Sequence, residues 1–367
     1  MKRTQAIRTR LKLLFTKAGA DVSESILPDL LSFTYTDKEN NEADEIDITL
    51  KDPMGKWAGT WKPKGGEIVR ASITEGLVEE HRKGKTLDCG KFYVDSLSCA
   101  GSPRTFTMKA VSIPLNSPIR KKVKSRAWEK KDLKEIAGEI AKENKMKLVW
   151  DCEEDQTYDR VEQKRESDLK FLSTRCEELG FSLKVTDDQI VIFDQARYER
   201  MKPVKTLTLG ESDILSWNFE SNQSETYKSC TVAFRDYRMK QKDAAAGFSL
   251  NESLTKDDSG ENKAVWNYTY TDPEADENGQ EFAYKCRAKS LDEAKRKARA
   301  KLRQLNLRSL TGSISVIGDV SLISGVVIEC KGFGSFDGNF IIGEATHGYT
   351  TGGYVTSLNL RRVNNKY

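Results

Sequence analysis

The C-terminal stretch from Ser324 to Arg362 constrains the fold of this chain more than any other segment. It contains three apolar runs, Val326–Cys330, Phe340–Ile342 and Tyr354–Leu360, separated by glycine-rich segments. The last run alternates, and the residues that share one of its faces are Tyr354, Thr356, Leu358 and Leu360. A period of two marks a strand with one buried face. The sequence therefore predicts that the chain ends in an antiparallel meander.

Glycine pairs predict where this meander turns. Asp337-Gly338 has the composition of a two-residue hairpin turn with positive φ, and Gly352-Gly353 suits a second turn. His347 lies in the glycine-rich corner before Tyr349. We interpret it as part of a hydrogen-bonded structural turn.

Length and charge limit the classes of protein to consider. The 367 residues are enough for two or three domains with a real core. Charged residues make up 32% of the chain, yet their signs nearly cancel to +4, which gives a soluble surface without indicating nucleic acid. No apolar run approaches the roughly 18 residues that span a bilayer, and Leu11–Phe15 is too short for a secretory signal. We expect a protein made in the cytoplasm, not exported by a signal and without a membrane partner.

Residues 1–113 show strand patterns throughout. Apolar residues alternate with polar ones around Ile46 and Ile48, and again around Phe106 and Met108. Several short strands of this kind predict a small barrel or sandwich. Two tryptophans, Trp57 and Trp61, lie in a loop rich in proline and glycine. They either pack the loop or contact a partner, since aromatic residues are enriched at interface cores.

The pattern changes period in residues 114–203. Prolines and the basic run Ile119–Arg126 are typical of a solvated linker. Two stripes at helical spacing follow, the first capped by Asp132 and the second by Ser167. Short strands lie between and after them. We therefore predict a compact α/β domain inserted at this point.

Residues 204–367 return to strand patterns around one clear helix. The segment 239–263 is polar with few apolar residues, which predicts a mobile insertion. The helix, 290–308, begins with a capping box of Ser290 and Glu293. Its polar faces carry many cations, among them Lys295, Arg299 and Arg303. A solvated face is the ordinary interpretation, and a face that lines a pore or meets an acidic neighbour is the alternative.

The sequence does not predict an active site, a metal or a cofactor. The two histidines, His81 and His347, each lack a second histidine at metal-ligand spacing. The seven cysteines are scattered without a CxxC pair, which favours reduced, buried thiols. Gly332–Gly338 contains GxG but no helix follows it, and neither a P-loop nor GxSxG occurs. We therefore expect a protein that is not an enzyme.

Two phrases in the chain resemble the phage late control D family, the baseplate hub proteins of contractile phage tails and related injection particles. The first is DGNFIIGEATHGYTTGGYVTSLNLRR, which begins at Asp337 and ends at Arg362. The second phrase precedes a helix and a Gly-Phe strand; its matching residues are Gln163, Glu166, Ser167, Asp168, Phe171, Leu172, Gly180 and Phe181. The resemblance covers most of the chain from Trp128 onward.

The resemblance implies an α+β, mainly β chain: two tail-tube-like β-barrel domains with an inserted α/β domain. In the family the two barrels lie side by side, so that a homotrimer forms a pseudo-hexameric ring between the tail tube and the central spike. The implied partners are the spike, the tube or its initiator, baseplate and tape-measure proteins, with non-specific DNA passage through the ring. The protein would reside in a virion or phage-tail-like particle. Our candidates for interface or lumen positions are Lys295, Arg299, Arg303, Tyr354, Leu358, Leu360, Trp57 and Trp61.

Two other classes of function stay open. A peptidoglycan-binding or peptidoglycan-cleaving tail component is the first, because Leu133, Ile136 and Ala137 fit the helix of a LysM-type module, although its Gly-Asp-Thr phrase is absent. The carboxylate pair of a glycosidase meets only in space, so sequence does not exclude one. A DNA-binding adaptor is the second, and it predicts affinity that falls steeply with salt.

Overall fold

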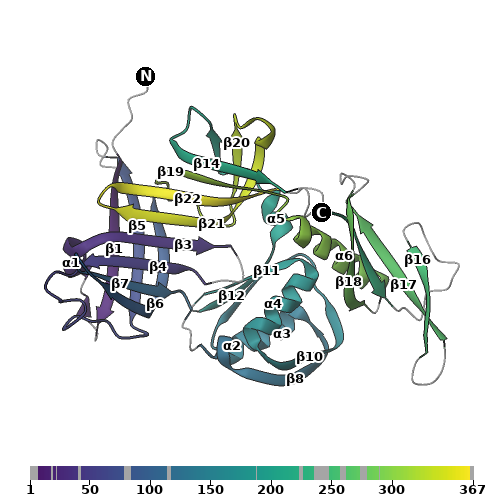
Figure 1. Cartoon of the computed structure of the whole chain (residues 1–367). Helices are drawn as coiled ribbons and strands as arrows, with labels where there is room; N and C mark the ends of the chain where they lie inside the picture. Colours follow the sequence, from purple (N-terminus) through teal and green to yellow (C-terminus); the bar gives the residue numbers. More distant parts are fainter. Residues whose placement is uncertain are drawn as a thin grey trace.

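The computed structural model describes residues 7–17, 20–21, 23–39, 43–77, 84–113, 117–186, 188–222, 226–234, 248–256, 262–272, 279–288 and 290–363. Figure 1 shows a β-rich region built from both ends of the chain, beside a middle unit of helices and strands and a smaller sheet with one long helix. The α+β, mainly β class predicted from the sequence is confirmed.

A 13-stranded sheet, here the large sheet, holds strands from both ends of the chain. From the N-terminal region come β1 (Ile7–Lys17), β2 (Ala20–Asp21), β3 (Leu30–Lys38), β4 (Glu45–Lys51), β5 (Ile68–Leu77), β6 (Thr86–Ala100) and β7 (Thr105–Val111). From the C-terminal region come β13 (Lys205–Thr208), β14 (Ile214–Ser221), β19 (Leu310–Ile317), β20 (Val327–Lys331), β21 (Gly338–Thr350) and β22 (Gly353–Arg362). The main path is β14-β19-β22-β21-β3-β4-β7-β6-β5-β1-β2, with β20 and β13 branching from β21.

Strands β21 and β3 form the seam between the two ends of the chain. They pair antiparallel from Glu344 opposite Lys38 to Thr350 opposite Ser32. Hydrogen bonding is continuous across the seam, so the N-terminal and C-terminal β regions belong to one sheet. The domain ranges 1–113, 114–203 and 204–367, and the two separate β-barrels, stay predictions.

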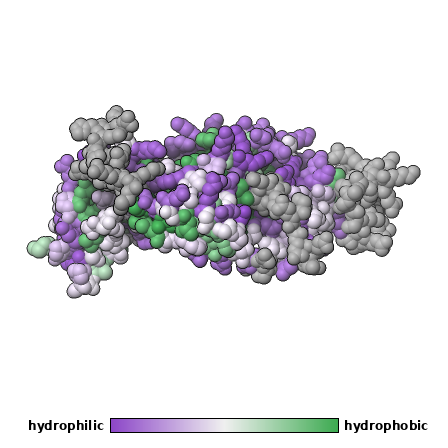
Figure 2. All heavy atoms as spheres, turned by 90° about the horizontal axis from the view of Figure 1, so that it is seen from above, coloured by the Kyte–Doolittle hydropathy of each residue, from purple (hydrophilic) through white to green (hydrophobic). Residues whose placement is uncertain are grey.

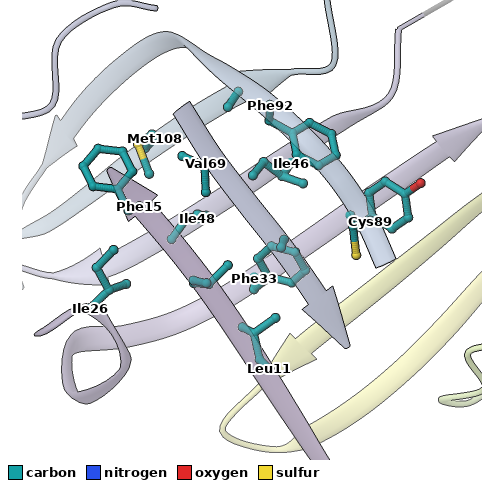
Figure 3. Packing of buried hydrophobic residues seen from close by; sticks show 14 of the residues in the cluster. Leu11, Phe15, Ile26, Phe33, Ile46, Ile48, Val69, Cys89, Phe92 and Met108 are labelled. Atoms are coloured by element: carbon teal, nitrogen blue, oxygen red, sulfur yellow. The ribbon is translucent and has the colours of Figure 1, made fainter. Parts of the chain in front are cut away.

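Alternating side chains give the large sheet one apolar face. At the seam Phe33 and Tyr35 lie on this face, and Ile48 and Ile46 stand opposite them on β4. Figure 3 shows how side chains from β1, β3, β4, β5 and β6 converge in this core. Burial of each large aliphatic or aromatic side chain stabilises the fold by roughly 1.5–3 kcal/mol.

The middle unit spans α2 to α5. Its elements are α2 (Pro118–Lys121), β8 (Val123–Asp132), α3 (Leu133–Glu143), β9 (Lys147–Asp151), β10 (Thr157–Ser167), α4 (Asp168–Leu179), β11 (Phe181–Val185), β12 (Gln189–Asp194) and α5 (Gln195–Glu199). Both predicted helix starts are confirmed: Asp132 and Glu135 form a capping box, and Ser167 accepts a hydrogen bond from the Lys170 amide. Helix α4 ends at Gly180, whose φ of 79° suits glycine.

The basic run Ile119–Arg126 is not a solvated linker, so that prediction is wrong. Ile119 is fully buried in the core of the middle unit. Lys124 and Arg126 lie on β8, which pairs with β10. Charge alone predicts solvent exposure, but both cations contact the buried carboxylate of Asp168.

The smaller sheet has the order β16-β17-β15-β18 and is covered by α6. Its elements are β15 (Tyr227–Phe234), β16 (Phe248–Lys256), β17 (Asn262–Thr271), β18 (Gln280–Ala288) and α6 (Leu291–Asn306). The predicted helix is confirmed, with Ser290 as its cap and Ala294, Ala298 and Leu302 buried.

The segment 239–263 was predicted to be a mobile insertion. Within it, Phe248–Lys256 is strand β16, which pairs with β17, and β17 itself begins at Asn262. An edge strand such as β16 is held by its backbone hydrogen bonds to β17 and does not need a strong apolar pattern. Its composition therefore does not predict a strand. The other residues of this segment lie outside the described part of the chain.

The loop geometry of the C-terminal meander differs in part from the prediction. Strands β20 and β21 are joined by residues 332–337, and Asp337 accepts a hydrogen bond from the Phe333 amide at 2.6 Å. Asp337-Gly338 therefore closes a wider loop and is not a two-residue hairpin. The second turn is confirmed, because Thr350 stands opposite Gly353 across a tight turn.

Candidate functional site: the polar sheet face and its buried junctions

The face of the large sheet opposite its apolar face carries small hydroxyl side chains around the seam. Thr36 stands opposite Thr346, Thr346 opposite Ser357, and Ser357 opposite Ser315. The hydroxyls of Ser315 and Ser357 are 2.9 Å apart. The band therefore runs unbroken across four strands, from β3 to β19. We call this surface the polar face.

Some charges on the polar face pair with opposite charges on a neighbouring strand, among them Lys38 with Glu45 at 3.8 Å. On β7 and β4 the Lys109 ammonium lies 3.3 Å from the Asp47 carboxylate. Beside the seam, Asn359 donates a hydrogen bond to Glu344 at 2.9 Å. Around the seam, hydroxyl groups dominate this surface, which is suited to let a chain or polymer pass without holding it.

The candidate positions on the last strand lie on the other side of the sheet. Tyr354, Leu358 and Leu360 are buried in the apolar face, so within this chain they are core residues. The residues of β22 on the polar face include Val355, Ser357 and Asn359. The predicted alternation of β22 is correct, and its apolar side packs in the core of this chain; an interface or lumen role for these residues stays a prediction.

His347 lies at the seam, inside β21 and not in a corner as predicted. It is fully buried, and its Nδ1 is 2.7 Å from the Tyr354 hydroxyl. The imidazole stacks between the rings of Tyr35 and Tyr354, with centroids 5.9 and 6.0 Å away. Burial lowers the pKa of His347 to about 4, so the ring is neutral at pH 7. Its geometry is that of a structural residue holding β21 to β22.

The cations of α6 divide into two groups. Lys295 and Arg299 are exposed, as a solvated or partner-facing helix face requires. Arg303 is only 6% exposed, and its guanidinium lies 2.7 Å from the Glu199 carboxylate. Arg303 is therefore paired inside the chain, and its selection as an interface or lumen candidate stays a prediction.

A buried network, here the junction network, joins four distant parts of the chain: Glu39, Glu199, Arg303 and Arg361. Arg361 of β22 donates to Glu199 of α5 and, at 3.1 Å, to Glu39, which follows β3. All four side chains are buried, and their charges balance. Burial lowers the pKa of Arg361, but the attraction of Glu39 and Glu199 outweighs it and the net pKa is raised. No sequence spacing signals these contacts.

A second junction holds the middle unit against the large sheet. Lys184 of β11 lies 2.8 Å from the Asp37 carboxylate and 3.2 Å from that of Asp44. The other oxygen of Asp37 accepts a hydrogen bond from the Ser324 amide at 2.9 Å. Burial lowers the pKa of Lys184, but the two carboxylates outweigh it and raise the net pKa. The middle unit is thereby fixed to both halves of the large sheet.

The two candidate tryptophans pack their own loop. Trp57 is buried, and its indole donates a hydrogen bond to Asp29 at 3.0 Å. The Lys56 ammonium lies 4.5 Å from the Trp57 ring centroid and 4.6 Å from that of Trp61. These contacts are what the loop-packing interpretation requires.

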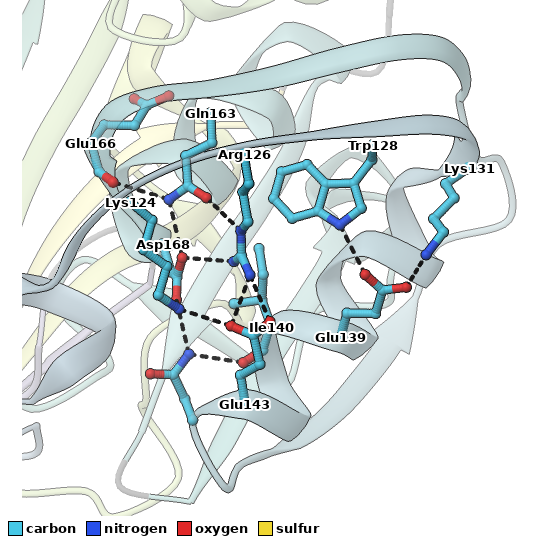
Figure 4. A network of polar contacts seen from close by, with 11 residues as sticks. Lys124, Arg126, Trp128, Lys131, Glu139, Ile140, Glu143, Gln163, Glu166 and Asp168 are labelled. Atoms are coloured by element: carbon cyan, nitrogen blue, oxygen red, sulfur yellow. Dashed lines mark hydrogen bonds and ion pairs between the residues drawn. The ribbon is translucent and has the colours of Figure 1, made fainter.

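The phrase around Gln163 and Asp168 builds a polar network inside the middle unit (Figure 4). Asp168 is fully buried at the start of α4, where Lys124 contacts it at 2.6 Å and Arg126 at 2.9 Å. Gln163 and Asn144 each donate a further hydrogen bond to it at 3.0 Å. Burial raises the pKa of Asp168, but these partners outweigh it and lower the net pKa. The phrase therefore has a structural role.

A cleft of about 310 Å³ separates the middle unit from α6. Its lining includes the acidic residues Glu153, Glu154 and Asp194 together with Arg200, Arg296, Arg299 and Arg303. The acids are thus interleaved with at least as many arginines. Among the described residues, no group of three or more His, Cys, Asp and Glu side chains could hold a metal ion. In the same part of the chain, every helix is too short or too polar to cross a membrane.

The family model for the phage tail baseplate hub (GPD) matches residues 93–353. Two curated proteins described as baseplate hub proteins are similar to this chain. The one from Escherichia phage 186 is 26% identical over 203 residues, which is 54% of this chain and 50% of the relative. The one from Escherichia phage P2 is 27% identical over 197 residues, which is 53% of this chain and 48% of the relative. The chain spans about half the length of the curated relatives it matches.

Solved structures share the fold over almost the whole chain. The tail protein from Neisseria meningitidis MC58 matches with a TM-score of 0.67 at 13% identity, covering 98% of this chain and 99% of that one. The 43 kDa tail protein of prophage MuSo2 from Shewanella oneidensis matches with a TM-score of 0.64 at 13% identity, covering 97% and 98%. A component of the type VI secretion system of E. coli matches with a TM-score of 0.54 at 13% identity, covering 99% and 78%.

Proposed function

The chain belongs to the phage tail baseplate hub family, and from this premise we propose that it is a structural hub subunit of a contractile phage tail or phage-tail-like particle. Three copies form a pseudo-hexameric ring that joins the tail tube to the central spike. In such a ring each copy supplies two β regions, one from each end of the chain. The proposed partners are the spike, the tube or its initiator, and baseplate and tape-measure proteins.

The observation that carries this proposal is the seam between β21 and β3. It places two β regions side by side in one sheet, with the hydroxyls of Thr36, Thr346 and Ser357 in a continuous band on one face. Turned toward the ring axis, this face would line a channel wall that binds nothing tightly. DNA or a tape-measure segment would then pass along it.

A solution mass measurement tests the ring. We expect a mass of three chains, either for the protein alone or after co-expression with its cognate spike. A strictly monomeric chain in both preparations would contradict the proposal.

We also propose that the hub role is not enzymatic. Arginines are interleaved with the acidic residues of the cleft beside α6, an arrangement that supports ionic packing more than general acid–base work. A glycan-hydrolysis assay with purified peptidoglycan tests this, and Glu154→Gln is the informative variant because Glu154 lines the cleft. Hydrolysis that this variant abolishes would favour the wall-cleaving alternative.

A further inference from the structure

An apolar pocket of about 340 Å³ lies where the middle unit meets the large sheet. Its apolar walls come from β12, from α5 with the segment after it, and from the segment that leads into β20. Glu39 of the junction network and Lys184 of the second junction also line it. Ligand pockets have volumes of roughly 300–1,000 Å³, so this one is large enough to hold a ligand. Its aliphatic and aromatic lining residues are Val191, Phe193, Tyr198, Met201, Val204, Ile323, Val326 and Val327.

Buried ion pairs hold the walls of this pocket in place. Lys184 on one wall lies 2.8 Å from the Asp37 carboxylate of the large sheet. Glu39 on another wall lies 3.1 Å from the Arg361 guanidinium, which also belongs to the large sheet. The pocket is therefore formed by contacts that exist within the chain before any ligand binds. A preformed pocket of this kind loses little conformational entropy on binding.

Apolar surface continues outside the pocket. Met201 and Val204 are 48% and 55% exposed, and Val149 of β9, which stands opposite Val191 on the same face, is 41% exposed. In the view of Figure 2, hydrophobic residues reach the surface over the β-rich half, whereas the rest is mainly hydrophilic. Contiguous exposed apolar residues mark interaction sites. A small molecule inside the pocket would leave these three side chains exposed, so the occupant that fits is a segment of a protein.

The charges beside this apolar surface select an acidic segment. Lys202 lines the pocket and Lys147 lies on the same face of β9 as the apolar surface; both are exposed. Neither lysine has an ion-pair partner within the described part of the chain. The carboxylate on that face of β9, Asp151, is already paired with Arg197 at 2.6 Å, as Glu39 is with the junction network. Carboxylates on the partner would therefore complement the charges that this chain leaves unmatched.

We infer that this pocket binds a large apolar side chain from an acidic segment of another protein of the tail particle. The inference rests on the proposed function and adds the chemistry of one partner to it. The apolar side chain fills the pocket, and the carboxylates beside it face Lys147 and Lys202. A buried apolar anchor with a polar rim is the usual arrangement of a protein interface.

The place of the pocket in the fold gives its occupant a second effect. A side chain in the pocket contacts both the middle unit and the large sheet. A ligand that binds only one arrangement of two parts stabilises that arrangement by mass action. The partner therefore holds the middle unit against the large sheet, in addition to the two buried junctions.

Photo-crosslinking inside the assembled particle tests the inference. The photoreactive amino acid p-benzoylphenylalanine takes the place of Met201 at the pocket. In the control it takes the place of Val123, which is 62% exposed on β8 of the same middle unit. Purified particles are irradiated, and mass spectrometry identifies the captured residue. We expect the Met201 position to capture one segment of another particle protein, in which aspartate or glutamate lies beside a large apolar residue. The Val123 position should not capture this segment.

Two variants measure what the charge and the apolar mouth contribute. Lys202→Glu reverses the exposed cation, and Val204→Asp places a carboxylate at the mouth of the pocket. We expect each to lower the crosslink yield from the Met201 position by roughly fivefold or more. Lys134→Glu, a charge reversal at an exposed position of α3, should leave the yield unchanged. Thermal unfolding followed by circular dichroism shows which variants fold, and the exposed position of Lys202 keeps the test valid if Val204→Asp does not.

Several results would overturn the inference. They are capture of a second copy of this chain, capture of a segment without acidic residues, and the absence of any captured protein. Crosslink yields that Lys202→Glu and a folded Val204→Asp leave unchanged would overturn it as well. In each case the chain is still part of the particle, so the proposed function stands. If the chain is missing from purified tail particles, the proposed function fails together with the inference.

Discussion

Two buried polar networks of this protein differ in how far apart in the chain their residues lie. The Asp168 network lies inside the middle unit, and its partners Lys124, Arg126 and Gln163 come from adjacent strands of that unit. The junction network joins Glu39, Glu199, Arg303 and Arg361 from four separate parts of the chain. The first network stabilises one unit, whereas the second sets how the units lie against each other. For a subunit of the proposed ring, the second network is the more consequential.

The largest expected effect is at the junction network. Replacing Arg361 with leucine leaves Glu39 buried without its cation and Glu199 with Arg303 alone. Breaking a buried ion pair in this way costs roughly 3–5 kcal/mol. We expect chemical denaturation of Arg361→Leu to split into separate transitions, because the middle unit keeps its own core. A single cooperative transition at native stability would show that the network does not hold the units together.

Acid should distinguish the seam from the middle unit. The folded pKa of His347 is about 4, below its ordinary value of 6.5, so the unfolded chain binds the proton more readily. Stability from this residue is therefore full above pH 6.5 and is lost as the pH falls toward 4, by up to roughly 3 kcal/mol. The folded pKa of Asp168 lies below its ordinary value of 3.8, so the stability that its carboxylate contributes is lost only when the pH falls below 3.8. Hydrogen exchange between pH 7 and 4 measures the protection of backbone amides at the seam and in the middle unit.

His347→Gln is the control for the acid experiment, because glutamine keeps a hydrogen-bonding group near Tyr354 without titrating. This variant should show a smaller loss of protection in β21 and β22 as the pH falls. An equal acid loss in the variant would assign the effect to groups other than His347 whose folded pKa lies below the unfolded value.

A smaller and more local effect is expected in the middle unit. Asp168→Asn removes the charge that Lys124 and Arg126 share but keeps an amide of the same shape. We expect a loss of roughly 2 kcal/mol, confined to amides of α4 and β8 in hydrogen exchange. Glu143→Gln is the matched control, since Glu143 contacts the same two cations from the surface and should cost less than about 1 kcal/mol. Loss of protection at the seam as well would break the distinction between the two networks.

The smallest effect on stability is expected on the exposed face of α6. Lys295→Glu with Arg299→Glu should change the free energy of unfolding by no more than about 0.5 kcal/mol, because neither side chain is buried. If this face meets an acidic partner in the particle, the same variant should assemble poorly while folding normally. Arg303→Glu, on the same helix, should instead destabilise strongly, because it places two carboxylates together in a buried site.

Local signals made much of the fold predictable. The caps at Asp132, Ser167 and Ser290 were found from sequence because each cap and its partner lie within three residues. The alternation in β22 was found because a strand with one buried face repeats every second residue. Strand β16 was missed, since pairing of the backbone leaves little trace in composition.

The candidate site was much less predictable. Helical spacing does not distinguish Arg303 from Arg299 on α6. Only the position of Glu199 in space shows that Arg303 forms a buried ion pair whereas Arg299 is an exposed charge. The polar face was missed because threonine and serine at alternating positions look ordinary until β21 pairs with β3. Long-range pairing determines both features, and a single sequence does not contain it.

The most direct test of the account is electron cryo-microscopy of the chain assembled with its cognate tube and spike. The account predicts three copies around a central channel, with Thr346 and Ser357 facing that channel. A reconstruction in which this hydroxyl surface points away from the axis, or in which the chain occupies a site outside the central ring, would contradict it.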